Sequence, residues 1–119
     1  MSTLVIGVDG GGSKTTVVVA GARGADLASV TGAPSAVRPG QIGKSADTIQ
    51  QLVGEALAEA GKADQRPSAL CIGVAGVGRD AEFAAFFAAI QERDLADELV
   101  VLPDAVVALE DAFGDDAGI

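Results

Sequence analysis

The residues with the clearest chemical potential lie together near the N-terminus, in the stretch Gly7-Val8-Asp9-Gly10-Gly11-Gly12-Ser13-Lys14-Thr15-Thr16. Consecutive glycines allow a backbone with positive φ and leave amide N–H groups uncovered by side chains. Successive exposed amides form a concave anion site, to which Ser13, Lys14 and Thr15 add hydroxyls and a cation. Asp9 follows an apolar run, and its carboxylate is suited to holding Mg²⁺ through water. The stretch therefore predicts a phosphate and magnesium site.

Two familiar phosphate-binding motifs do not fit this stretch. A Walker A loop requires Gly-Lys-Ser/Thr, whereas Ser13 separates Gly12 from Lys14 here. The dinucleotide fingerprint requires a third small residue where Thr15 stands. Both motifs also open a helix, but the β-branched run from Thr15 to Val19 favours a strand. We predict a β-hairpin whose tip binds phosphate, although the stretch alone is equally consistent with an ordinary glycine-rich hairpin.

The composition excludes several classes of function. With 17 acidic and 8 basic residues, the chain has a formal net charge of −9, which argues against nucleic acid or anionic membrane as a partner. Histidine is absent, so no Ser–His or Cys–His nucleophile can form within the chain. The single Cys71 lies in an apolar run and is interpreted as a small buried residue. Without an evident signal peptide or membrane span, we expect a soluble, cytoplasmic protein.

Apolar periodicity and turn residues predict eight elements that position this stretch. In chain order they are strands at 3–8, 15–20 and 26–31, a helix at 45–60 ended by Gly61, a strand at 69–75, a helix at 80–92, a strand at 98–102 and a helix at 105–113. A hairpin sheet continued through crossover helices becomes a mixed sheet. We therefore expect an α/β domain of element order β-β-β-α-β-α-β-α. Its five strands are expected in the spatial order 3-2-1-4-5, with helices on both faces.

Three segments that could carry chemistry follow strands that this topology makes parallel. Ligands of open α/β sheets bind at the carboxyl ends of such strands, where Asp9, the glycine loop at Gly76 and Asp104 all fall. Asp104 also precedes the last predicted helix, where it would serve as an N-cap; as a base it would accept a proton from an attacking hydroxyl. Gly76 is interpreted either as a plain turn or as space for a substrate. Lys14 is interpreted either as a solvated charge or as a phosphate ligand.

With these residues in view, the chain resembles the first lobe of the actin-like ATPase and sugar kinase superfamily. Within it, the stretch from Gly7 to Thr15 is similar to the first phosphate motif of the BadF/BadG/BcrA/BcrD ATPase family, which includes N-acetylglucosamine and glucosamine kinases. The pair Asp104-Ala105 matches the family's catalytic aspartate, and Gly76 matches its substrate-side glycine loop. The resemblance extends over the whole chain in element order and spacing.

The resemblance implies a ribonuclease-H-like lobe, paired with a second lobe and holding ATP and Mg²⁺ in the cleft between them. The residues it assigns to ATP and magnesium are Asp9, Gly10, Gly11, Gly12, Ser13, Lys14 and Thr15, with Asp9 at the metal. It assigns Asp104 as the catalytic base, and Gly76 and Ser35 to the substrate. The family's second phosphate loop would begin shortly after Ile119. Residues 1–119 are therefore expected to be a truncated N-terminal lobe that is inactive alone.

The expected substrate is the hydroxyl of an amino sugar. In acetylated-hexosamine kinases of the family, an Asn in the loop after the third strand contacts the sugar. The comparable stretch here is Ser35-Ala36-Val37-Arg38-Pro39-Gly40, and the chain contains no Asn. N-acetylglucosamine and glucosamine both stay open as acceptors. Dimers are common in the family, which leaves a homodimer possible.

Two other functions stay open at this point. One is the activator ATPase of a 2-hydroxyacyl-CoA dehydratase, which would need cysteines for an iron–sulfur cluster, and Cys71 is poorly placed for that. The other is a nucleotide-responsive regulatory protein without turnover. Loss of Asp104 would discriminate this last case, because nucleotide binding would survive it whereas phosphoryl transfer would not.

Overall fold

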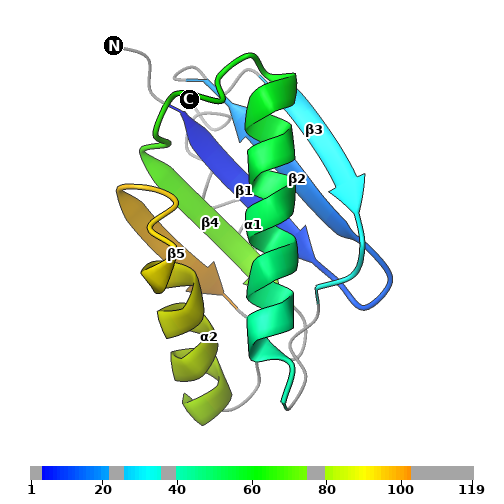
Figure 1. Cartoon of the computed structure of the whole chain (residues 1–119), viewed down its shortest axis with the longest axis vertical. Helices are drawn as coiled ribbons and strands as arrows, with labels where there is room; N and C mark the ends of the chain where they lie inside the picture. Colours follow the sequence, from blue (N-terminus) through cyan, green and yellow to red (C-terminus); the bar gives the residue numbers. More distant parts are fainter. Residues whose placement is uncertain (1–3, 22–25, 36–39, 75–79, 103–119) are drawn as a thin grey trace, which may run out of the picture.

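The computed structural model describes residues 4–21, 26–35, 40–74 and 80–102. These residues form one sheet and two helices (Figure 1). The strands are β1 (Val5–Gly10), β2 (Thr15–Ala20), β3 (Asp26–Gly32), β4 (Ala69–Val74) and β5 (Glu98–Leu102), and the helices are α1 (Ile42–Glu59) and α2 (Asp80–Glu92). All seven were predicted, within a few residues at their ends. The predicted helix at 105–113 lies outside the described residues.

The sheet has the predicted strand order, β3-β2-β1-β4-β5. The pairs β1–β2 and β2–β3 are antiparallel, whereas β4 is parallel to β1 and β5 is parallel to β4. Strand β1 runs two residues further than the predicted 3–8, because Asp9 pairs with Thr16 and Gly10 with Thr15. The carboxyl ends of β1, β4 and β5 consequently share one edge of the sheet, where α1 and α2 also begin (Figure 1).

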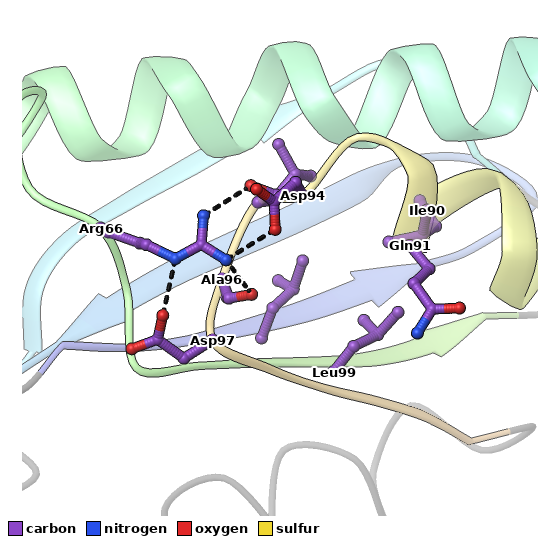
Figure 2. Close-up of a pocket in the computed structure, with 9 residues that line it drawn as sticks. Arg66, Ile90, Gln91, Asp94, Ala96, Asp97 and Leu99 are labelled. Atoms are coloured by element: carbon purple, nitrogen blue, oxygen red, sulfur yellow. Dashed lines mark hydrogen bonds and ion pairs between the residues drawn. The ribbon is translucent and has the colours of Figure 1, made fainter.

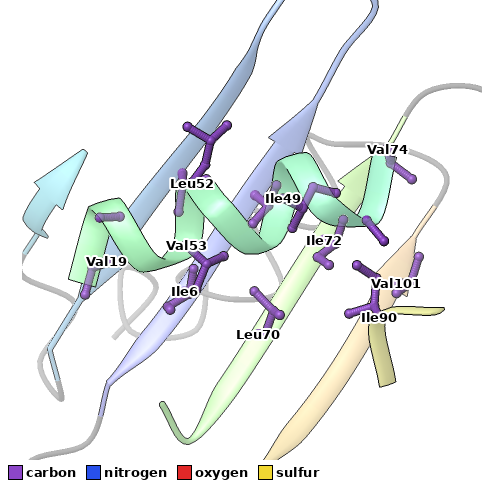
Figure 3. Packing of buried hydrophobic residues seen from close by; sticks show 14 of the residues in the cluster. Ile6, Val19, Ile49, Leu52, Val53, Leu70, Ile72, Val74, Ile90 and Val101 are labelled. Atoms are coloured by element: carbon purple, nitrogen blue, oxygen red, sulfur yellow. The ribbon is translucent and has the colours of Figure 1, made fainter. Parts of the chain in front are cut away.

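One face of the sheet carries the hydrophobic core. Alternate residues of the strands are buried against α1 and α2 (Figure 3), among them Ile6 and Val8 of β1, which are 0% exposed. Because side chains alternate between the faces of a strand, Asp9 belongs to the opposite face. Both described helices therefore cover the same face. A helix on the other face, which was also expected, would have to come from residues outside the described part.

Helix α1 is longer than predicted but ends where expected. It begins at Ile42, whose half-buried side chain extends the apolar stripe by a turn beyond the predicted start at Ser45. Its end is a Schellman motif: the N–H of Gly61 donates to Ala58 (3.0 Å) and that of Lys62 to Leu57 (2.8 Å). Gly61 has φ +72°, which favours glycine. Neither described helix is long and apolar enough to cross a membrane.

Candidate functional site

The tip of the β1–β2 hairpin forms the centre of the predicted phosphate site. The N–H of Gly11 donates to the carbonyl oxygen of Lys14 across the turn, with N and O 2.9 Å apart. The next three N–H groups, those of Gly12, Ser13 and Lys14, make no hydrogen bond with the described part of the chain, and all three residues are exposed. Adjacent free amides beside a lysine are suited to binding an anion. The N–H of Gly11 is instead used in the hydrogen bond to Lys14 that closes the turn.

The three glycines of the hairpin have different surroundings. None of Gly10, Gly11 and Gly12 adopts the left-handed backbone that consecutive glycines allow. A Cβ added at Gly10 would lie 2.5 Å from Ser35 Oγ, and one added at Gly11 would lie 3.2 Å from the carbonyl oxygen of Lys14. At Gly12 an added Cβ would meet nothing within 4 Å. Close packing therefore requires the first glycine, whereas the third leaves its backbone open to an approaching ligand.

Behind the tip, the loop after β3 packs against the hairpin. Thr15 Oγ1 lies 2.6 Å from the carbonyl oxygen of Ala33 and 2.7 Å from Ser35 Oγ. The Ser35 N–H donates to the carbonyl oxygen of Gly11 at 3.2 Å. The exposed fractions of Thr15 and Ser35 are 0% and 1%. Both were predicted as ligand-binding residues, and the structure turns their hydroxyls toward one another.

Asp9 lies at the carboxyl end of β1, between Thr16 of β2 and Gly73 of β4. It is half-buried. Among the described residues, no group of three or more His, Cys, Asp or Glu side chains is arranged to hold a metal ion. A single carboxylate nevertheless fits Mg²⁺, because this ion keeps several waters and takes further oxygens from phosphate groups.

The other predicted site residues, Gly76 and Asp104, lie outside the described residues. The strands that precede them do end at the edge of the hairpin: Val74 of β4 pairs with Gly10, and Leu102 of β5 pairs with Gly73. The topology thus brings the ends of these strands beside the tip of the β1–β2 hairpin. This is the juxtaposition of strand ends on which the predicted site depends.

A cluster that the sequence did not suggest lies near the amino ends of β4 and β5. Arg66 makes four hydrogen bonds, to the carboxylates of Asp94 (2.7 Å) and Asp97 (2.6 Å) and to the carbonyl oxygens of Asp94 and Ala96 (Figure 2). The hydrogen bond from Arg66 lowers the pKa of Asp94 below its ordinary value of 3.8. These residues border a cavity of about 150 Å³ that Leu70 and Leu99 also line. Because the guanidinium of Arg66 binds groups of the segment before β5, the cluster connects the loop before β4 to the loop before β5.

Comparison with known proteins decides the family. The sequence profile of the BadF/BadG/BcrA/BcrD ATPase family matches residues 6–119. The chain belongs to this family. It is also 30% identical, over 115 residues, to an N-acetylmuramic acid/N-acetylglucosamine kinase from Clostridium acetobutylicum. That alignment covers 97% of this chain and 38% of the kinase.

A solved structure shares the fold of this chain. A candidate N-acetylglucosamine kinase from Chromobacterium violaceum superposes with a TM-score of 0.72 at 27% sequence identity. The match covers 84% of this BadF/BadG-family chain and 34% of the other protein. The predicted α/β lobe of the actin-like ATPase and sugar kinase type is therefore confirmed. The chain spans little more than a third of the length of either protein.

Proposed function

We propose that this chain is the first lobe of an ATP-dependent sugar kinase that phosphorylates a hydroxyl of an amino sugar, N-acetylglucosamine or glucosamine. The observation that carries the proposal is the exposed hairpin tip, where the free amides of Gly12, Ser13 and Lys14 lie at the sheet edge shared by β1, β4 and β5. The names of the two similar proteins support an amino sugar as the acceptor. The proposal makes residues 1–119 the N-terminal part of a longer, cytoplasmic protein.

In this proposal the backbone from Gly10 to Thr15 surrounds the phosphates of ATP, and the Lys14 ammonium offsets their charge. Asp9 would hold Mg²⁺, which neutralises charge on the phosphate oxygens when bound. Asp104 is the proposed base. The sugar oxygen attacks the γ-phosphorus while Asp104 takes its proton, the bond to the β-phosphate oxygen breaks, and ADP leaves. Gly76 and the loop of Ser35 belong to the substrate side.

The test is ADP release by the full-length protein that contains these residues, with Mg·ATP and glucosamine, N-acetylglucosamine, glucose or no sugar. The Asp104→Asn variant is expected to lose sugar-dependent turnover by at least about 100-fold, as expected when a general base is removed, while still binding ATP. Glu59→Gln is the matched control, since it removes an exposed carboxylate at the far end of α1. Sugar-independent ADP release would contradict the proposal and favour the activator ATPase, and ATP binding without any turnover would favour a regulatory protein.

A further inference from the structure

We propose that Thr15 and Ser35 act as positioning residues, whose buried hydroxyl pair holds the phosphate hairpin in its ligand-binding form. This inference rests on the proposed function, because it takes the exposed hairpin tip as the nucleotide site. It assigns the two hydroxyls a role behind the site. The ligand contacts then belong to the free amides of the tip and to Lys14.

The proton count within the cluster supports this role. A hydroxyl carries one proton, and a carbonyl oxygen can only accept. Thr15 Oγ1 is the donor in both contacts, to the carbonyl oxygen of Ala33 at 2.6 Å and to Ser35 Oγ at 2.7 Å. Its single proton is therefore engaged within the cluster. Thr15 has none left to donate to a phosphate or a sugar.

Ser35 also fixes the backbone from which the tip projects. Its N–H binds the carbonyl oxygen of Gly11 at 3.2 Å. Its Oγ occupies the space beside Gly10, at 2.5 Å from where a Cβ would stand. The contacts of Ser35 thus reach Gly10, Gly11 and Thr15, which flank the free amides on both sides. Because Thr15 and Ser35 are almost fully buried, water cannot readily replace a lost hydrogen-bond partner. Losing one partner should therefore destabilise this conformation of the hairpin.

The geometry predicts how substitutions combine. Thr15→Val keeps the side-chain shape but leaves the Ser35 hydroxyl and the Ala33 carbonyl without their partner. We expect the Kd for ATP to rise about 10-fold, the value of one well-placed hydrogen bond, with a smaller change in kcat. Thr15→Ser retains the hydroxyl and should restore the Kd to within about 3-fold. Adding Ser35→Ala to Thr15→Val should raise the Kd for ATP little further, because both changes remove the same hydrogen bond.

The experiment is a titration of the full-length protein and these variants with Mg·ATP in the absence of sugar, accompanied by thermal melting. A raised Kd in Thr15→Val, rescue by Thr15→Ser and non-additivity with Ser35→Ala would support the positioning role. A lowered Tm with an unchanged Kd would overturn it, as would additive effects on the Kd. If Thr15→Val does not fold, Ser35→Ala alone should raise the Kd for ATP while Thr15→Ser leaves it within about 3-fold. A lowered Tm with an unchanged Kd in Ser35→Ala would then overturn the positioning role.

The titration also separates failure of this inference from failure of the proposed function. Sugar-independent turnover in the unmodified protein would refute the kinase while leaving the ATP titrations readable. Absence of ATP binding by the unmodified protein would overturn both.

Discussion

Gly12→Ala is expected to weaken ATP binding without destabilising the protein. The structure separates these effects because an added Cβ at Gly12 meets nothing within 4 Å, and the backbone there is not left-handed. The methyl group would therefore occupy only the space through which a phosphate approaches the free amides. Gly10→Ala is the contrasting change, since its Cβ would lie 2.5 Å from Ser35 Oγ.

The expected magnitudes follow from these distances. Replacing glycine by alanine without strain stabilises by about 0.4–1 kcal/mol through the unfolded chain, so Gly12→Ala should leave the Tm unchanged or slightly raised. Losing one hydrogen bond to a charged phosphate costs about 1.5–3 kcal/mol, which raises the KM for ATP by about 10-fold to about 100-fold. At Gly10 the added carbon needs a shift of the buried Ser35 hydroxyl, and overpacking of this kind costs about 1–3 kcal/mol.

The assay pairs thermal melting with the ATP dependence of sugar phosphorylation in the full-length protein. Gly54→Ala is the matched control: Gly54 is exposed within α1, with open space around an added Cβ. Its replacement should stabilise by about 1 kcal/mol and leave the KM for ATP unchanged. If Gly12→Ala raised the Tm as Gly54→Ala does and left the KM for ATP unchanged, the hairpin tip would not be the phosphate site.

Two further predictions concern stability. Asp94→Asn should lower the Tm more at about pH 7 than at about pH 3. Arg66 lowers the pKa of Asp94, so the carboxylate stabilises the fold fully above the ordinary value of 3.8, and this effect declines as the pH falls toward and through the folded-state pKa. Asn tolerates the left-handed φ of 53° at this position, and an equal loss at both pH values would contradict the reasoning. Phe86→Ala, at a side chain that is 0% exposed, should cost about 3–5 kcal/mol in urea unfolding. The half-buried Phe83 should cost less when replaced in the same way, and equal losses would refute this account of the core.

Much of the fold could be predicted because its determinants are local. Ile49, Leu52, Val53 and Ala56 recur at the helical spacing that predicted α1, and all four are buried in the core. Gly61 ends that helix as predicted, and it does so with a left-handed backbone. The helix start was misplaced because Gln41, its N-cap residue, makes no side-chain capping hydrogen bond that would mark the boundary.

The hairpin that carries the candidate site was predicted from the sequence, but the packing inside it was not. The glycine run allows positive φ, but none of its three glycines adopts it, and Gly10 is required because Ser35 packs against it. Motif reasoning treats each residue as a ligand, and so it could not distinguish Thr15, which faces inward, from Lys14, which is exposed. The alternation of β2 offered a usable signal, because Thr15 shares a face with the buried Val17 and Val19.

Residue types and their spacing were enough to predict the seven described elements, the order of the five strands and the hairpin that carries Asp9. Apolar periodicity, β-branching and helix caps act over a few neighbouring residues and can be read along the chain. Which hydroxyls and charges meet could be seen only in the folded chain, because Ser35 and Thr15 are 20 positions apart and Arg66 and Asp94 are 28 apart. Such contacts depend on the register of β3 on β2 and on how β4 and β5 align. A polar side chain pairs with whichever donor or acceptor this alignment places within hydrogen-bonding distance.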